Sequence, residues 1–338
     1  MVVVMRTDAT EADVERVCEK VREVGGEAFV SRGTVHTIIG LVGDSALFRA
    51  LDLDNLPGVD HLIQVGKPYK MVARSLHPEP TVVRVGSAEV GRSTFTIIAG
   101  PCAVESEAQA HEACRAAKEA GAAILRGGAF KPRTSPYSFQ GLGKRGLEIL
   151  AECRAETGLP VVTEVVDPRD VDLVAEWADA LQIGTRNMQN FELLKAVGAA
   201  AKPVMLKRGF AATIEEWLMA AEYIAQRGNS EIILCERGIR TFETATRNTL
   251  DLAGMAVAQR ESHLPVIVDP SHATGQRDLV APMARAALAA GADGVMVDVH
   301  PNPDEALCDG PQALRPADLQ ALAEDLRALA AVLGRSMG

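Results

Sequence analysis

From Phe95 onward, short apolar runs alternate with amphipathic stretches. The runs are FTIIAG, AAILRG, LPVVTEV, ADALQIG, KPVMLKRG, SEIILCERG, LPVIVDPSH and ADGVMVDVH. Because they are apolar throughout, they are typical of strands buried on both faces of a parallel sheet. Stretches such as EAQAHEACRAAKEAG and TIEEWLMAAEYIAQRG have helical periodicity. Four predicted helices end in glycine, as C-terminal caps do: Gly121, Gly158, Gly228 and Gly291.

Eight strand–helix units over roughly 240 residues are the number and size of a (β/α)₈ barrel, which we predict for residues 93–338. A doubly wound open sheet is the alternative. That fold carries a Gly-rich phosphate loop after its first strand, and GPCAVES is not such a loop.

Residues 1–66 have a different pattern. An apolar run, MVVVMR, precedes a predicted helix behind a Thr10 cap, and the helix carries valines at helical spacing (Val14, Val17, Val21 and Val24). EAFVS and TVHTIIGLVG then predict a hairpin, followed by a weak helix around Ala46–Leu51 and a last strand, VDHLIQV. This β-α-β-β-α-β order predicts a small α+β ferredoxin-like domain.

Residues 67–92 predict a linker followed by a hairpin in TVVRVGSAEVGRS. The whole chain has 338 residues, of which 47% are hydrophobic and 24% charged, so two globular domains are expected.

The net charge of −10 argues against nucleic acid as a partner, since a phosphate backbone needs a broad basic surface. No apolar run is long enough for a membrane span, and the N-terminus lacks the features of a secretory signal. Six scattered cysteines suit the reduced thiols of a cytosolic protein. The sequence therefore predicts a cytoplasmic protein with neither membrane nor nucleic acid as a partner.

Polar side chains follow the predicted barrel strands at their carboxyl ends, where barrel enzymes build their active sites. Every strand supplies at least one group that binds a metal or an anion. These residues are Cys102, Arg126, Glu164, Gln182, Arg186, Lys207, Arg237, Asp269, His272 and Asp298.

One subset offers a thiolate, an imidazole and two carboxylates: Cys102, His272, Asp298 and Asp309. This mixed set of sulfur, nitrogen and oxygen donors suits Mn²⁺, Fe²⁺, Zn²⁺ or Co²⁺ better than Ca²⁺ or Mg²⁺. Taken singly, Cys102 would be apolar filler and His272 a turn residue. Their convergence at strand ends favours a metal site instead. Cys308 lies next to Asp309 and is a candidate for oxidation.

A second subset is cationic: Arg126, Lys131, Arg133, Arg186, Lys207 and Arg237. So many cations in one mouth would repel one another unless multiply charged anions bind there. We therefore expect substrates with two or three anionic groups. His300 either points into the mouth or stabilises its loop, and His111 and His263 are expected to be surface or packing residues.

Seven ordered motifs carry a resemblance to a known family. They are IAGPCAVES, LRGGAFKPRTSPYSFQGLG, LQIGTRNMQNFELL, LKRGF, ILCERGIRTFE, VDPSHATG and VHPNPDEALCDGPQAL. The chain resembles the type Iβ 3-deoxy-D-arabino-heptulosonate-7-phosphate (DAHP) synthases over essentially its whole length. The sister family, the 3-deoxy-D-manno-octulosonate-8-phosphate synthases, typically reads Lys-Ala-Asn-Arg-Ser where this chain reads Lys131-Pro132-Arg133-Thr134-Ser135.

The resemblance implies a transferase of the shikimate pathway, which condenses phosphoenolpyruvate with D-erythrose 4-phosphate and releases phosphate. It implies metal ligation by Cys102, His272, Asp298 and Asp309, with Cd²⁺ added to the possible ions. Lys131, Cys102, His272 and Glu164 are the implied catalytic residues. The implied phosphoenolpyruvate site is Arg126, Lys131, Glu164, Gln182, Arg186, Lys207 and Arg237, and the implied erythrose phosphate clamp is Arg133, Thr134 and Ser135.

The chain departs from the family at Asp298, where the family usually has Glu. The shorter side chain reaches a metal only through a backbone shift or a water molecule, so this ligand is less secure than Cys102 or His272.

The resemblance also implies that residues 1–66 form a feedback module for tyrosine or phenylalanine, and that the enzyme is a homo-oligomer, a tetramer. A chorismate mutase partner domain would be helical, which residues 1–66 are not. Two alternatives stay open: the eight-carbon synthase acting on arabinose 5-phosphate, and a non-catalytic amino-acid-binding regulator that kept a barrel.

Overall fold

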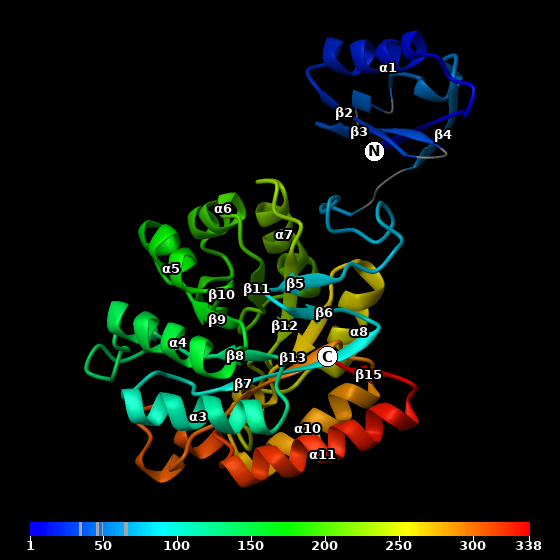
Figure 1. The fold of residues 1–338 in the computed structure, drawn as a ribbon. Coiled ribbons are helices and arrows are strands. Elements are labelled where there is room, and N and C mark those ends of the chain that lie inside the picture. Colours follow the sequence, from blue (N-terminus) through cyan, green and yellow to red (C-terminus); the bar gives the residue numbers. More distant parts are fainter. Residues whose placement is uncertain (34–35, 45–46, 49, 64–66) are drawn as a thin grey trace. The chain divides into compact units, whose positions relative to one another are not determined.

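The computed structural model describes residues 1–33, 36–44, 47–48, 50–63 and 67–338. Two compact units make up the chain, Met1–Lys70 and Met71–Gly338. Figure 1 shows the small α+β fold of the first unit and the barrel of the second.

The N-terminal unit has the predicted ferredoxin-like architecture. Its four strands form an antiparallel sheet in the order β2-β3-β1-β4, with β1 paired to both β3 and β4. The elements are β1 (Val2–Met5), α1 (Glu11–Glu23), β2 (Glu27–Arg32), β3 (Thr37–Val42), the 3₁₀ helix η1 (Leu53–Asn55) and β4 (Val59–Ile63).

Helix α1 begins as the sequence predicts. The Thr10 side chain accepts a hydrogen bond from the Asp13 amide, and the Asp13 carboxylate accepts one from the Thr10 amide, which closes a capping box. Val14, Val17 and Val21 of the helix are buried in the core of this unit. The predicted helix around Ala46–Leu51 and the predicted strand end at Gln64–Val65 include positions outside the described residues, as does the predicted hairpin at Thr34–Val35.

The barrel unit contains the predicted eight parallel strands, which close through pairing of the last with the first. Seven strands fall within their apolar runs, and β7 begins one residue before its run, at Thr94. The strands are β7 (Thr94–Gly100), β8 (Ile124–Arg126), β9 (Val161–Glu164), β10 (Ala180–Ile183), β11 (Val204–Lys207), β12 (Ile232–Glu236), β13 (Val266–Val268) and β14 (Gly294–Asp298). A short C-terminal strand, β15 (Ser336–Met337), adds to β7 in parallel.

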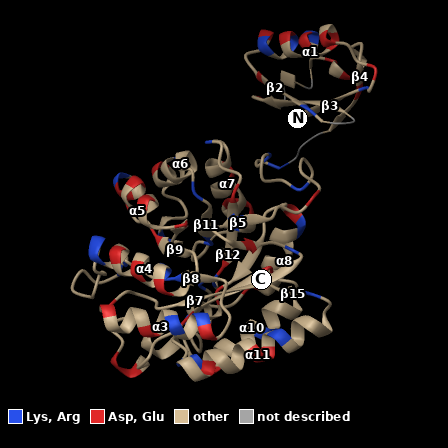
Figure 2. Cartoon of the chain, viewed as in Figure 1, with Lys and Arg blue, Asp and Glu red and all other residues tan. Residues whose placement is uncertain are grey.

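Helices surround the strands, and Figure 2 shows acidic and basic positions along α3, α4, α5 and α11. The helices are α3 (Glu107–Glu119), α4 (Lys144–Thr157), α5 (Val171–Trp177), α6 (Phe191–Ala199), α7 (Ile214–Ala225), α8 (Leu252–Glu261), α9 (Pro270–Thr274), α10 (Arg277–Ala289) and α11 (Pro316–Val332). Four short 3₁₀ helices lie in the loops: η2 (Pro168–Asp170), η3 (Thr185–Asn187), η4 (Pro303–Glu305) and η5 (Gly310–Gln312). Among the described residues, no helix combines the length and the apolar character that a bilayer crossing requires.

The predicted hairpin before the barrel is formed by β5 (Val83–Val85) and β6 (Ala88–Val90). Its apolar side chains join one buried cluster with residues from all eight barrel strands, among them Ile98, Met205 and Met296. Side chains drawn from every strand meet only inside the barrel, so the hairpin packs against the barrel interior. The interior is therefore a packed core, and chemistry is confined to the strand ends and their loops.

Candidate active site

The loops after the barrel strands surround a cavity with a volume of about 260 Å³. Its lining includes every predicted substrate-binding residue and the predicted ligands His272 and Asp309. Cys102 and Asp298 lie beside the cavity and contact its lining. The lining residues are Arg126, Lys131, Pro132, Arg133, Thr134, Ser135, Ser138, Glu164, Gln182, Gly184, Thr185, Arg186, Lys207, Arg237, Arg247, His272 and Asp309.

Gly100 ends β7 and brings two strand ends into close contact. Its φ is +151°, and a Cβ there would lie 2.1 Å from the Arg126 carbonyl oxygen. Only glycine allows this approach of backbone to backbone. The following Pro101 carbonyl accepts a hydrogen bond from Arg126 Nη1 at 2.9 Å. The stretch GPC therefore sets Cys102 directly beside the end of β8.

Asp269 fixes the orientation of His272. Its side chain caps α9 by accepting a hydrogen bond from the His272 amide at 2.9 Å, with Pro270 at the first helical position. The other carboxylate oxygen lies 2.8 Å from His272 Nδ1. A carboxylate at Nδ1 holds the proton there and leaves the Nε2 lone pair free. The stretch DPSH therefore makes Nε2 the nitrogen that faces the cavity groups.

The groups at the Nε2 edge of His272 are Cys102, Asp309 and Lys131. Cys102 Sγ lies 3.5 Å from Nε2 and donates a hydrogen bond to Asp309 Oδ2 at 3.1 Å. Lys131 Nζ lies 2.7 Å from Cys102 Sγ and 3.2 Å from Asp309 Oδ2. Sulfur, nitrogen and oxygen donors from three distant loops thus meet around one point, with a lysine beside them.

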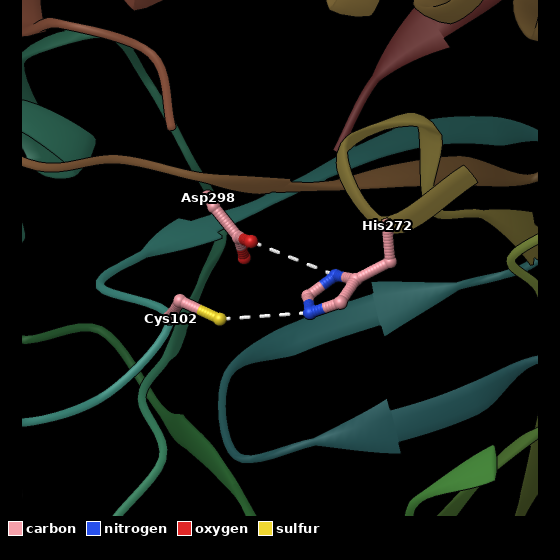
Figure 3. Close-up of side chains that lie close together, drawn as sticks. All are labelled: Cys102, His272 and Asp298. Atoms are coloured by element: carbon pink, nitrogen blue, oxygen red, sulfur yellow. Dashed lines mark hydrogen bonds and ion pairs between the residues drawn. The ribbon is translucent and has the colours of Figure 1, made fainter. Parts of the chain in front are cut away.

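Asp298 lies against the opposite edge of the same ring. Its Oδ2 is 3.5 Å from His272 Nδ1, whereas Cys102 contacts Nε2, as Figure 3 shows. Both carboxylate oxygens have other partners: Oδ1 is 2.9 Å from Arg126 Nη1, and Oδ2 accepts a hydrogen bond from Gln312 Nε2 at 2.7 Å. The ligand atoms of Cys102, His272 and Asp298 still lie within 4.8 Å of one another. The role of Asp298 as a direct ligand remains a prediction.

The chemistry of these donors fits a borderline divalent metal ion. Burial lowers the pKa of His272 to about 4, despite the carboxylates of Asp269 and Asp298, so the imidazole is neutral near pH 7. Burial raises the pKa of the Cys102 thiol well above its usual value, so binding of a metal as thiolate must release a proton. Asp309 keeps its pKa well below the usual range despite burial, because Lys131, His272 and Arg247 surround it.

Cationic side chains dominate the rest of the cavity. Seven Lys and Arg residues line it against two carboxylates, those of Glu164 and Asp309. Arg237 is buried, and its Nε and Nη1 donate no hydrogen bond. Lys207 Nζ lies 2.5 Å from Asp269 Oδ2, so the residue that orients His272 also fixes a cavity lysine. A buried guanidinium with unused donors is a site for an anion.

Glu164 and Gln182 line the cavity at the ends of the neighbouring strands β9 and β10. Gln182 Nε2 donates a hydrogen bond to Glu164 Oε2 at 3.1 Å. Burial raises the pKa of Glu164, although Lys131, Lys207 and Arg126 act in the opposite direction. A carboxyl whose proton is held more tightly than usual is suited to acid–base chemistry.

The loop between β8 and α4 carries Arg133, Thr134 and Ser135 at the outer part of the cavity. Arg133 Nη1 donates to the Phe139 carbonyl at 3.1 Å, and Arg186 Nη2 donates to Thr134 Oγ1 at 3.3 Å. Thr134 is thereby tied to the loop after β10, whereas the Arg133 contact stays within its own loop.

Arg247 and Gln312 were not predicted from the sequence, nor were Ser138 and Thr185 of the cavity lining. Arg247 lines the cavity and donates to Asp309 Oδ1 at 3.0 Å and to Gln312 Oε1 at 2.7 Å. It lies in the long loop between β12 and α8, far beyond the strand end, where position alone gave no signal. Gln312 lies in η5, and no sequence pattern indicates its hydrogen bond to Asp298.

Other predicted candidates lie outside the cavity. His300 Nε2 lies 3.3 Å from Glu105 Oε2, and Glu105 also accepts hydrogen bonds from the amides of Leu307 and Cys308. His300 therefore stabilises the loop that carries Asp309. His263 is buried and His111 pairs with Glu156 on the helical surface, in line with the packing and surface roles expected for them.

Comparison with protein families gives two matches along the chain. Residues 81–333 match the model described as the DAHP synthetase I family, and residues 1–67 match the DAHP synthase ferredoxin-like domain. A phospho-2-dehydro-3-deoxyheptonate aldolase from Thermotoga maritima is 50% identical over 334 residues, which is 99% of each chain. A 2-dehydro-3-deoxyphosphooctonate aldolase from Syntrophotalea carbinolica is 34% identical, over 72% of this chain and 93% of its own.

Two solved structures of DAHP synthases are also similar to this chain. The crystal structure of the Thermotoga maritima phospho-2-dehydro-3-deoxyheptonate aldolase (DAHP synthase) aligns with a TM-score of 0.80 at 49% identity, over 100% of this chain and 99% of that one. A truncated form of the 3-deoxy-D-arabino-heptulosonate 7-phosphate synthase from the same organism aligns with a TM-score of 0.75 at 50% identity. It covers 80% of this chain and 99% of its own.

Proposed function

The chain belongs to the DAHP synthetase I family, and from that premise we propose that it condenses phosphoenolpyruvate with D-erythrose 4-phosphate. The products are DAHP and inorganic phosphate, with one water consumed, in the first step of the shikimate pathway. The observation that carries the proposal is the concentration of seven cationic side chains in one cavity of a chain with net charge −10. Two phosphorylated substrates match that concentration.

In this proposal five cationic side chains of the cavity hold phosphoenolpyruvate. Arg237, with two unused donors, and Arg186 and Lys207 bind its phosphate and carboxylate, while Arg126 and Lys131 lie deeper beside Asp298 and Cys102. Arg133, Thr134 and Ser135 bind the phosphate of the sugar at the outer part of the cavity. Fixing both substrates in attack geometry turns a two-substrate reaction into a local one.

The enol carbon of phosphoenolpyruvate attacks the aldehyde carbon, and positive character develops at the carbon that carries the phosphate ester. Water adds there, and phosphate leaves with cleavage of its C–O bond. In this proposal Lys131 donates a proton to the aldehyde oxygen, and Glu164, whose pKa is raised by burial, exchanges a proton with the water. His272 is a second candidate for that exchange.

Cys102, His272 and Asp309 are the residues we propose to hold a divalent ion, with Asp298 as a fourth ligand or as a group that orients the others. Such an ion, when bound, supplies polarisation of the aldehyde oxygen or orientation of the water. Mn²⁺, Fe²⁺, Zn²⁺, Co²⁺ and Cd²⁺ all suit this donor set.

The N-terminal module is proposed to bind an aromatic amino acid, tyrosine or phenylalanine, and to couple that binding to the active site. Homotetramer assembly and a cytoplasmic location are further parts of the proposal and rest on the family likeness.

A phosphate-release assay tests the main proposal. Phosphoenolpyruvate is supplied with erythrose 4-phosphate or with arabinose 5-phosphate, before and after exhaustive chelation and re-addition of Mn²⁺. We expect release with erythrose 4-phosphate, loss of activity on chelation and recovery with Mn²⁺. Release with arabinose 5-phosphate alone would identify the eight-carbon synthase. Release with neither sugar would reject both enzymes and favour the non-catalytic regulator.

A further inference from the structure

The ring of Phe210 has three guanidinium groups around it. The distances from its centroid to the guanidinium carbons are 5.4 Å for Arg186, 5.1 Å for Arg237 and 4.9 Å for Arg240. Each distance is within the range at which the negative face of an aromatic ring attracts a cation. Arg186 and Arg237 line the active-site cavity, whereas Phe210 and Arg240 are not part of its lining.

The position of Phe210 in the barrel explains how one ring reaches all three. Phe210 follows the end of β11, which lies between β10 and β12. Arg186 is in the loop after β10, and Arg237 and Arg240 follow β12. The Phe210 carbonyl accepts a hydrogen bond from the Arg240 amide at 2.6 Å, which fixes the loop of the aromatic residue to the loop of two of its cations.

Arg237 gains most from this contact. It is buried, two of its nitrogen donors have no hydrogen-bond partner, and burial lowers its pKa despite the nearby Asp269. No carboxylate lies within ion-pair distance of it among the described residues, so the ring face is a compensating contact beside the longer-range charge of Asp269. Without a partner the guanidinium would reorient, and its unused donors would no longer be directed at the position of an anion.

We infer that Phe210 is a positioning residue: its ring face holds Arg237 and Arg186 in the geometry that binds the phosphorylated substrate. Phe210 makes no contact with the substrate in this proposal and takes no part in bond making. The inference rests on the proposed function, because it names the anion as phosphoenolpyruvate. A merely apolar role for the ring predicts different behaviour, since any side chain of similar volume would then serve.

The main series of variants weakens the negative electrostatic potential of the Phe210 ring face and nearly keeps the size of the ring. Phe210 is substituted by 4-fluoro-, 3,4-difluoro- and 3,4,5-trifluorophenylalanine, which progressively remove the negative charge from the ring face, and separately by Tyr and Leu. Binding of inorganic phosphate and steady-state kinetics with phosphoenolpyruvate are measured on the full chain. Phe242, whose ring is 97% exposed, carries the same fluorinated residues as a matched control.

We expect KM for phosphoenolpyruvate to rise stepwise with fluorine number and to reach about tenfold in Phe210→Leu, with kcat changed far less. Phe210→Tyr should stay near wild type, and the Phe242 series should be flat. An unchanged KM across the fluorinated Phe210 variants would overturn the inference. If Phe210→Leu alone then weakens binding, the ring acts through packing. If no variant weakens binding, the ring has no role in it. If the wild-type chain binds phosphate but releases none from phosphoenolpyruvate, the proposed function is rejected. The phosphate affinities of the Phe210 variants then still test the role of the ring.

Discussion

Arg126 and Asp298 form a buried ion pair across the end of β7: Arg126 Nη1 lies 2.9 Å from Asp298 Oδ1, although β8 and β14 are not neighbours. The strand between them ends at Gly100, which lacks a side chain that would fill the space. A charge buried at this depth requires a partner, because each group alone carries a large desolvation cost. The pair therefore connects a proposed substrate residue to a proposed metal ligand.

Replacing Arg126 with Met should destabilise the barrel by about 3–5 kcal/mol, because it leaves the Asp298 carboxylate buried without its cation. Urea unfolding of the single variant and of Arg126→Met/Asp298→Asn measures the effect. The double variant removes the uncompensated charge and should recover part of the loss. Equal stability of the single and double variants would contradict the argument.

Replacing Asp298 with Glu should strengthen metal binding by about tenfold. The carboxylate of Asp298 lies at the Nδ1 edge of His272, held by Arg126 and Gln312, while Cys102 and Asp309 lie at the Nε2 edge. One added methylene lets the carboxylate extend toward that second edge. Calorimetric titration with Mn²⁺ measures the change, and Asp304→Glu, at an exposed position in a nearby loop, is the control. Unchanged or weaker affinity in Asp298→Glu would count against this geometry.

The barrel and its site were predictable because two strong signals coincide. Runs such as LPVVTEV and KPVMLKRG are apolar throughout, so strand type and burial follow from one pattern. In a parallel barrel all strands end on the same side, which places Glu164 and Lys207 at one mouth without knowledge of any distance. The four helix-ending glycines likewise have positive φ, from +72° to +95°.

Side-chain orientation could not be predicted in this way. The sequence placed Asp298 and Asp309 in one ligand set, yet the two carboxylates face different nitrogens of His272. That division depends on Asp269 at the start of α9, Arg126 at the end of β8 and Gln312 in η5, which lie far apart in the sequence. The position of Arg247 in the site could not be predicted for a similar reason, since it contacts Asp309 from the interior of a long loop.

Replacing Cys102 with Ser should weaken metal binding strongly while the barrel stays folded. Two clusters of potential metal ligands among the described residues contain cysteine, and Cys102 belongs to both. Serine has a similar size and keeps the hydrogen bond to Asp309. Metal content after dialysis and the urea unfolding midpoint separate the two effects. Cys114→Ser, a buried thiol in α3, is the matched control. A Cys102→Ser variant with wild-type affinity for Zn²⁺ or Cd²⁺ would remove the thiol from the proposed site.

Deleting residues 1–66 should leave catalysis and abolish inhibition by tyrosine or phenylalanine. The barrel unit has its own core, and its hairpin packs against the barrel interior without residues of the first unit. A truncated relative that aligns with 80% of this chain supports an autonomous barrel. Kinetics of the full and truncated chains with each amino acid check the prediction. Inhibition that survives the deletion would place the effector on the barrel.

Lowering the pH below about 6.5 should destabilise the barrel through His263. Its Nδ1 lies 2.7 Å from Thr81 Oγ1 and its Nε2 lies 2.9 Å from the Met71 carbonyl oxygen, an arrangement that suits a neutral imidazole. Burial lowers its pKa from the ordinary value of 6.5, and the Met71 carbonyl offsets this only in part. The unfolded chain therefore binds a proton more readily than the folded one. The resulting stability is present above the unfolded pKa and is lost as the pH falls through the folded pKa.

His263→Gln, which cannot titrate, should reduce this pH dependence without abolishing it, since His272, whose pKa burial lowers to about 4, contributes in the same direction. His61→Gln at an exposed position should not reduce it. Thermal unfolding midpoints at about pH 7.5 and about pH 5.5 measure the difference. A midpoint of wild type that falls no further than that of His263→Gln would mean that other groups carry the effect. The direction of the effect follows from the burial of His263. Its neutral ring contacts Met71 and Thr81 and so connects the segment before β5 to the barrel. Protonation of the buried ring weakens this connection.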